Sequence, residues 1–213
     1  MTPTDLINIA TLGITTGNSW GVNYPTLVVS FTTQVEYTSF HTDFRNRLLE
    51  RQGVESKRIL SISNLRKANK ELAAGVKFLK AYLVEEYDKA DASSHYSEYG
   101  LVLESKTYRF PIDNDDRMKK LDTLVNTLSA PNNPFRDKKY GLAYWENLRN
   151  EHRNSWTLCK TLDGNRSVLA KAIQLDKKKA LDLQSRLRQQ VRINDKENYK
   201  SIWRNLGFQS EKY

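Results

Sequence analysis

A long run of apolar residues at helical spacing limits what this chain can fold into. From Ser56 to Leu101, apolar side chains recur at three- and four-residue steps, at Leu65, Leu72, Val76, Leu79, Leu83 and Tyr87. This spacing predicts one long amphipathic helix. Charged residues make up 28% of the chain, with only nine Gly and five Pro. Such a composition favours an all-α protein.

The residues before this helix predict two more helices. Pro3 after Thr2 suits a helix start, and the short helix that follows is expected to end at Gly13 and in the polar cluster 16–19. Residues 20–25 then form a connector. Residues 25–52 keep a helical rhythm, although the β-prone stretch 26–32 leaves a strand as the alternative. Gly53 is expected to form a turn between two antiparallel helices.

The second half of the chain predicts the same order of elements. Residues 101–113 have no helical period and contain Pro111, so they are expected to be a linker. A helix capped by Asp113 or Asn114 should follow, with an inner face of Met118, Leu121, Leu124, Val125 and Leu128. Long helices are expected at 137–162 and from 165, separated by a turn at 163–165. The last helix should break at 194–195 and end at Gly207 in a Schellman motif.

The two halves match at positions 107 to 112 residues apart. Leu65, Leu79 and Leu83 pair with Ile173, Leu187 and Val191 at an offset of 108, and Gly100 pairs with Gly207 at 107. We therefore expect a six-helix bundle built from two tandem, duplicated three-helix units, 1–107 and 108–213. The two units either pack side by side or fuse into one core. The alternative is that any two amphipathic helical hairpins align in this way.

No residue pattern in the chain indicates catalysis or metal binding. The histidines His41, His95 and His152 lack the Glu-x-x-His spacing of a di-iron bundle, and His152 falls on an apolar face as a core residue would. Cys159 and His152 are seven residues apart, too far for the imidazole to activate the thiol. We expect no cofactor, no metal and no catalytic residue, although an enzyme site assembled from distant helices stays open.

The positive charge of the chain lies in its second half. Net charge is +9, and residues 1–107 are balanced at 12 Lys/Arg against 12 Asp/Glu. From Arg166 to Arg204 there are 11 Lys/Arg and four Asp/Glu, and the basic residues are expected partly on the side away from the apolar stripe and partly on one flank of it. The candidate anion- or partner-binding residues are Lys171, Lys177, Lys178, Arg188, Arg192, Lys196 and Lys200.

A basic helical surface of this kind suits an acidic partner. The sequence therefore favours a non-enzymatic helical interaction or scaffold protein that binds an acidic protein. The alternative is a nucleic-acid or ribonucleoprotein-binding protein that uses the same surface. The chain has no basic segment before a short apolar stretch at its start and no run of about 20 apolar residues, so we expect a cytoplasmic protein with no membrane span.

Overall fold

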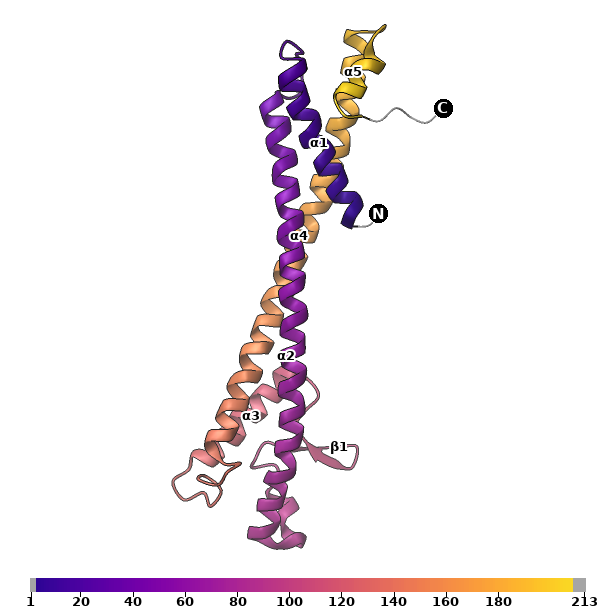
Figure 1. The fold of residues 1–213 in the computed structure, drawn as a ribbon. Helices are drawn as coiled ribbons and strands as arrows, with labels where there is room; N and C mark the ends of the chain where they lie inside the picture. Colours follow the sequence, from indigo (N-terminus) through magenta and orange to yellow (C-terminus); the bar gives the residue numbers. More distant parts are fainter. Residues whose placement is uncertain (1–2, 209–213) are drawn as a thin grey trace. The chain divides into compact units, whose positions relative to one another are not determined.

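The fold is mostly helical in the computed structural model, which describes residues 3–208 (Figure 1). These residues form five helices and one β-hairpin, and 77% of them are helical. The prediction of an all-α protein is confirmed, whereas five helices are present within residues 3–208 rather than six. The elements are α1 (Pro3–Asn23), α2 (Gln34–His95), β1 (Val102–Glu104), β2 (Thr107–Arg109), α3 (Asn114–Ser129), α4 (Leu142–Asn194) and α5 (Tyr199–Asn205).

The predicted turns at Gly53 and Gly164 are wrong, because both glycines lie inside continuous helices. α2 runs through Gly53 and α4 runs through Gly164, and no atom lies within 4 Å of a Cβ built on either residue. A glycine on an exposed helix surface costs only about 1 kcal/mol relative to Ala. Packing of the neighbouring turns outweighs that cost, so neither residue breaks its helix.

The chain divides into two compact units that differ from the sequential halves expected from the sequence. Unit 1 consists of Met1–Ser56 and Gly164–Tyr213, and unit 2 of Lys57–Asp163. Each unit therefore combines the beginning of one half of the chain with the end of the other half. Helices α2 and α4 each contribute one segment to unit 1 and one to unit 2.

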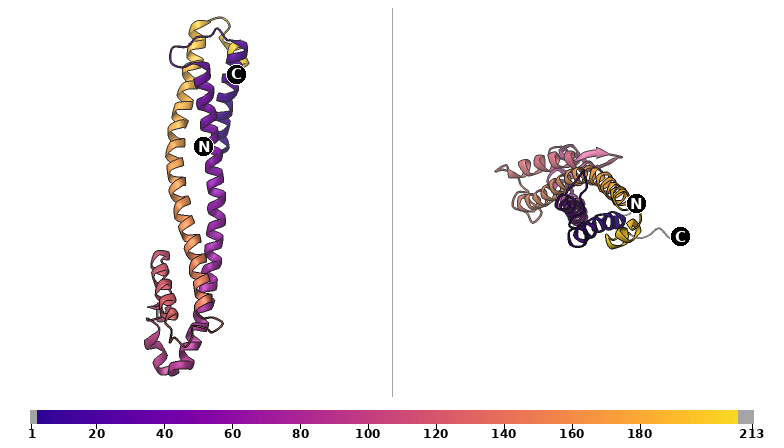
Figure 2. Two further views of the ribbon diagram at one scale, coloured as in Figure 1. Left: turned by 90° about the vertical axis from the view of Figure 1, so that its left-hand side faces the viewer. Right: turned by 90° about the horizontal axis from the view of Figure 1, so that it is seen from above.

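In unit 1, α1 lies along the first part of α2 (Figures 1 and 2). Contrary to the sequence prediction, α1 does not end at Gly13 but continues to Asn23. Gly13, Gly17 and Gly21 face α2, where a Cβ on Gly13 would overlap the His41 ring and one on Gly17 would overlap the Thr38 side chain. These glycines allow close helix packing. Trp20, predicted in a connector, lies within α1 and is buried, and its Nε1 donates to the Leu27 carbonyl at 3.0 Å.

The helix expected over 25–52 is present from residue 34 onward, whereas residues 25–33 form neither that helix nor the alternative strand at 26–32. Residues 24–33 form turns and irregular backbone, and α2 begins at Gln34. The Thr33 backbone N–H donates to Glu36 Oε2 at 2.9 Å, and the Glu36 N–H donates to Thr33 Oγ1 at 3.2 Å. This reciprocal capping box defines the helix start. It is a stronger local signal than the β-branched residues before it.

In unit 2, a β-hairpin and α3 pack on the second segment of α2 and the first segment of α4. The predicted linker contains strands β1 and β2, which pair antiparallel with Leu103 opposite Tyr108. The Asp113 side chain caps α3 by accepting from the Asp116 N–H at 2.9 Å. The predicted inner face of α3 is confirmed, because Leu121, Leu124, Val125 and Leu128 are buried in a core with Trp145 and Phe135.

Several contacts recur at positions about 108 residues apart. Leu101 N–H donates to Tyr96 O at 3.0 Å, and Phe208 N–H donates to Trp203 O at 2.9 Å. Gly100 and Gly207 take positive φ angles of 75° and 88°, as the predicted helix stops require. Thr127 Oγ1 donates to Glu98 O at 2.7 Å, and the matching Ser19 Oγ donates to Asn205 O at 2.5 Å.

The same correspondence extends to one pair of ionic contacts. In unit 1, Arg166 Nε lies 3.1 Å from Glu55 Oε2. In unit 2, the Nε of Arg58 forms an ion pair with Asp163, and these residues stand 108 positions from Arg166 and Glu55. Each position of one pair thus has a counterpart of the same charge in the other pair.

Candidate anion-binding site

The basic segment predicted from the sequence lies on the part of α4 that belongs to unit 1. One side of this helix is buried, at Leu169, Ile173, Ala180, Leu183, Leu187 and Val191. With about 100° between successive residues, five cations fall within a sector of about 120° that runs from one flank of the buried side, at Lys177, to the opposite side, at Lys171 and Lys178. We call this sector the α4 cationic face: Lys171, Lys177, Lys178, Arg188 and Arg192.

Lys196 and Lys200, the other two predicted site residues, lie beyond the end of α4. Lys196 belongs to the turn between α4 and α5, and Lys200 lies on α5. The break predicted at 194–195 is confirmed, since α4 ends at Asn194. Asp195 Oδ1 accepts from the backbone N–H of Asn198 at 2.8 Å and from that of Glu197 at 3.2 Å, which lowers the pKa of Asp195.

The lysines of the α4 cationic face are available to solvent. Lys171 and Lys178 are exposed and Lys177 is half-buried. Within residues 3–208, these three side chains make no hydrogen bond or ion pair. From Lys171 to Arg192 the face extends about 31 Å at the helical rise of about 1.5 Å per residue.

The two arginines of the face rest on aromatic rings of unit 1. The Arg188 guanidinium lies 5.5 Å from the centre of the Phe208 ring, and that of Arg192 lies 5.5 Å from the Tyr199 ring. Trp203 Nε1 also donates to the Arg188 carbonyl at 3.1 Å. Cation–π contacts of this kind hold a guanidinium in place while leaving its N–H donors free to bind an anion.

Carboxylates of α4 lie outside this face. Asp176 is buried on the core side, where it accepts from Arg47 of α2. Asp182 lies 3.7 Å from Arg186, one turn further along the helix. The α4 cationic face therefore has one acidic neighbour, Asp182, which lies at the edge of the sector one turn beyond Lys178, so that five cations outnumber a single exposed carboxylate on this side of the helix. That arrangement raises the local positive potential above what the net charge of the unit implies.

Two further cations of α4 were not predicted as site residues, and the structure gives them another role. The Lys179 ammonium lies 4.7 Å from the Phe40 ring, and the Arg186 guanidinium lies 4.3 Å from the Phe31 ring. Both side chains cover aromatic residues of α2 and its connector. Periodicity within α4 separates them from the face, because they fall on the other flank of the helix, but the sequence does not reveal the rings they cover.

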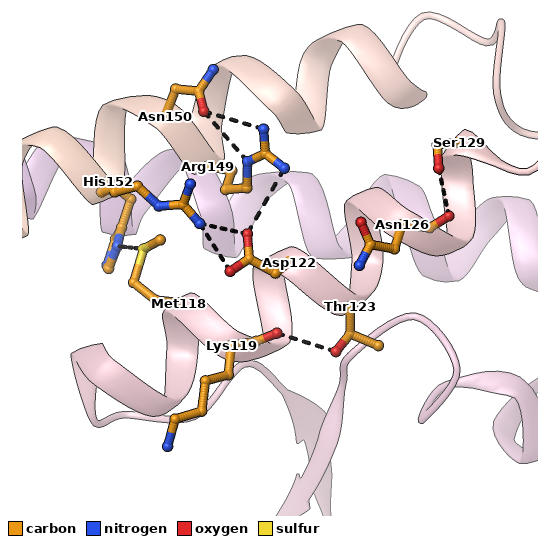
Figure 3. Close-up of polar contacts among 10 residues, drawn as sticks. Met118, Lys119, Asp122, Thr123, Asn126, Ser129, Arg149, Asn150 and His152 are labelled. Carbon is orange, nitrogen blue, oxygen red and sulfur yellow. Dashed lines mark hydrogen bonds and ion pairs between the residues drawn. The ribbon is translucent and has the colours of Figure 1, made fainter.

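The buried histidines are held as neutral side chains. His41 Nδ1 donates to the Tyr37 carbonyl at 2.9 Å, and burial lowers the pKa of His41. In unit 2, His152 is fully buried with its Nδ1 3.1 Å from the Met118 sulfur (Figure 3). Burial, and secondarily the charge of Arg117, lowers the pKa of His152 to about 4. Both residues are core histidines, as expected for His152.

The polar contacts around His152 join α3 to α4. Asp122 of α3 accepts from Arg153 of α4 at 2.6 Å, and the Arg149 guanidinium lies 3.8 Å from the same carboxylate (Figure 3). Arg117 of α3 donates to Asn69 Oδ1 at 2.6 Å and to the Pro111 carbonyl at 2.8 Å. These cations are matched by acceptors, so this cluster positions helices rather than presenting charge.

Cys159 and His95 each contact a polar neighbour. Cys159 is buried, and its Sγ lies 3.2 Å from Ser61 Oγ, to which it donates. His95 Nδ1 lies 3.3 Å from Glu98 Oε2, and the His95 ring stacks on Tyr87. Among the described residues, no three His, Cys, Asp or Glu side chains are grouped as metal ligands.

A hollow of about 390 Å³ opens at the end of unit 1. It is lined by Tyr24, Thr26, Leu27, Val28, Val191, Asn194, Asp195 and Ile202. The only ionisable carboxylate in that lining, Asp195, is occupied by the backbone N–H groups of the turn. Two other polar side chains of the lining also have partners within the chain, because Asn194 Oδ1 accepts from Gln190 and the Tyr24 hydroxyl accepts from Asn205. The hollow therefore offers few uncommitted polar groups of the kind that orient a small molecule.

Comparisons with models of protein families, with curated proteins and with solved structures found no match. In the part of the chain that the structure describes, no helix combines the length and apolar character needed to cross a bilayer.

Proposed function

We propose that this chain is a non-enzymatic helical interaction protein that binds an acidic partner protein through the α4 cationic face. The observation that carries the proposal is the run of five cations on one side of α4, which is bordered by one exposed carboxylate, Asp182. Lys171 and Lys178 are exposed and make no ion pair or hydrogen bond within residues 3–208, so binding an anion breaks no existing contact of theirs. Arg188 and Arg192 are held in place by rings beneath them.

An acidic protein fits this face better than a phosphate backbone does. Leu181, 42% exposed, lies among the cations, so the face offers aliphatic as well as charged surface. Nucleic-acid binders that contact unpaired bases present aromatic side chains for stacking. Here Tyr199 and Phe208 lie under the arginines and pack in the core of unit 1. The alternative, nucleic-acid or ribonucleoprotein binding, rests on the same cations and is distinguished by experiment.

The test uses the full chain with labelled poly-glutamate, a mixed-sequence RNA and a DNA duplex as probes, measured by fluorescence anisotropy at about 50 mM salt and at higher salt. The test variant is Lys171→Glu/Lys178→Glu. The matched control is Arg45→Glu/Arg51→Glu, which makes the same charge change on the α2 segment of unit 1. Circular dichroism verifies that each variant is folded.

We expect poly-glutamate to bind and the test variant to weaken its affinity at least about tenfold, whereas the control changes it little. Binding of RNA or DNA alone would support the alternative. If neither class of probe binds at low salt, or if both variants weaken binding equally, the proposal is wrong.

We also infer that the two halves of the chain arose by internal duplication. The inference is supported by the matching helix stops at Gly100 and Gly207 and by the ion pairs Arg58–Asp163 and Glu55–Arg166. It is tested in related sequences, where the halves should align at the same offset with higher identity than they have here. An offset that varies from one relative to another would contradict it.

A further inference from the structure

The balanced charge of the first half of the chain conceals a second basic stretch. Residues 57–80 of α2 carry seven Lys/Arg and one Asp/Glu, Glu71. Their counterparts 108 positions later, residues 165–188 of α4, carry seven Lys/Arg and two Asp/Glu. The first half is balanced because the stretches on either side are acidic. Residues 1–56 hold three Lys/Arg against five Asp/Glu, and residues 81–107 hold two Lys/Arg against six Asp/Glu. The basic stretch of α2 belongs to unit 2, whereas that of α4 belongs to unit 1.

Three cations of this stretch form one column on α2. Arg66, Lys70 and Lys77 fall within about 40° of one another at about 100° per residue. They lie on the side of the helix opposite the buried residues Leu65, Leu72 and Leu79. All three are exposed, and within residues 3–208 none of them makes a hydrogen bond or an ion pair. We call Arg66, Lys70 and Lys77 the α2 cationic column.

The neighbourhood of the column leaves it accessible and free of acidic side chains. Ala73, between Lys70 and Lys77 on the same side, is exposed and too small to hinder a partner. Glu71 falls about 100° away around the helix. On α2 the column is therefore a run of cations without a carboxylate among them, whereas the α4 cationic face has Asp182 at its edge.

Matching contacts border the two surfaces. Lys80, one turn beyond the column, donates to the Tyr108 carbonyl at 2.6 Å and lies 5.6 Å from the Tyr96 ring. Its counterpart Arg188 contacts Trp203, the counterpart of Tyr96, through the bond from Trp203 Nε1 to the Arg188 carbonyl. The hairpin in unit 2 and α5 in unit 1 thus lie beside the corresponding turn of each helix.

We propose that the α2 cationic column is a second binding surface for the acidic partner, so that one chain binds two acidic helical segments. This inference rests on the proposed function, because it assigns the same class of partner to both surfaces. The spacing fits a helix: Arg66, Lys70 and Lys77 stand one and two turns apart, so Glu residues four and seven positions apart on a partner helix meet them in register. The exposed Ala73 permits close approach of such a helix.

The experiment measures stoichiometry on the full chain by isothermal titration calorimetry. The probe is a synthetic helical peptide with Glu at positions that repeat every three and four residues. One variant, Lys70→Glu/Lys77→Glu, alters the α2 column, and Lys171→Glu/Lys178→Glu alters the α4 face. The control Lys89→Glu/Lys106→Glu makes the same charge change at exposed sites of unit 2 away from the column.

We expect the wild-type chain and the control to bind two peptides each. The α2 variant and the α4 variant should each bind one peptide, and a variant that combines all four substitutions should bind none. The neutral variant Lys70→Gln/Lys77→Gln should also bind only one peptide, or bind the second peptide more weakly. Because it adds no negative charge, its loss of binding cannot be due to misfolding caused by charge repulsion. The inference would be overturned if the wild-type chain bound one peptide, the α4 variant abolished this binding and the α2 variant left it unchanged. That result would still support the proposed function. Absence of binding to the wild-type chain would overturn both.

Discussion

Gly13 and His41 lie so close together that a single methyl group on Gly13 would overlap the imidazole ring. The imidazole ring of His41 cannot easily move, because its Nδ1 donates a hydrogen bond to the Tyr37 carbonyl and the side chain is fully buried. Contact at this point brings α1 against α2 without an intervening side chain. Glycine is thus required here by packing, although α1 is an ordinary helix in which Gly lowers intrinsic stability.

Gly13→Ala should therefore destabilise the protein, whereas Gly53→Ala should stabilise it. Overpacking at Gly13 is expected to cost about 2–3 kcal/mol. At Gly53, where nothing lies within 4 Å of the added methyl group, Ala should gain about 0.5–1 kcal/mol through its higher helix propensity. Urea unfolding followed by circular dichroism measures both changes. A loss of stability at Gly53 would mean that the chain does turn there.

Gly100→Ala should cost more stability than Gly207→Ala, although both glycines end helical segments with positive φ. Adopting that conformation costs Ala about 1–2 kcal/mol at either site. At Gly100 the added Cβ would also overlap the Lys120 carbonyl oxygen, whereas at Gly207 the nearest atom, Thr15 Cγ2, is 3.4 Å away. Thermal unfolding of the two variants tests the order, and equal losses would contradict the close backbone contact at Gly100.

The sequence predicts these stops correctly but fails at the interior glycines, and the reason is physical. Gly100 and Gly207 are each followed by an apolar residue that packs back, a local pattern that identifies a Schellman motif. Gly164 is followed by the polar Asn165, but Gly53 is followed by the apolar Val54, so the local pattern does not exclude a stop at Gly53, and the packing of distant segments decides that α2 continues there. A prediction from local sequence alone therefore places turns at residues where tertiary contacts keep the chain helical.

The β-hairpin and the second basic surface are missed for different reasons. Ser105 and Lys106 both take positive φ in the hairpin turn, a conformation that neither residue type favours. The basic stretch of α2 is present in the sequence but is cancelled when charge is summed over residues 1–107. It is nearly cancelled within the predicted helix 56–101 as well, which holds eight Lys/Arg and six Asp/Glu, and only a shorter window such as 57–80 shows it. The face of α4 is predictable because its cations and its apolar stripe follow one helical period.

Stability should fall as the pH drops from 6.5 toward 4, because His152 is buried as the neutral imidazole. Its pKa is about 4 in the folded protein, below the ordinary 6.5 expected in the unfolded chain. Below pH 6.5 the unfolded chain binds a proton that the folded protein rejects, and the full penalty, about 2–3 kcal/mol, is reached near pH 4. Above pH 6.5 this histidine contributes no pH dependence.

His152→Leu should reduce that acid dependence, since it removes the titrating group from the core. Urea midpoints measured between pH 4 and pH 7 provide the comparison. Some dependence should persist, because burial also lowers the pKa of His41. A variant whose stability changes with pH as steeply as that of the wild type would show that His152 is not buried as a neutral group.

Arg117→Lys should destabilise unit 2 even though it keeps the charge. The guanidinium of Arg117 donates to the carbonyls of Pro111 and Ile112 and to the Asn69 side chain, and so ties the segment before α3 to α2. An ammonium cannot reproduce that planar set of donors, and acceptors left partly buried cost free energy. We expect a loss of about 2 kcal/mol in urea unfolding. Arg66→Lys, at an exposed site, should change stability by less than about 0.5 kcal/mol. Equal effects at the two sites would mean that the bonds of Arg117 contribute no more than a surface charge.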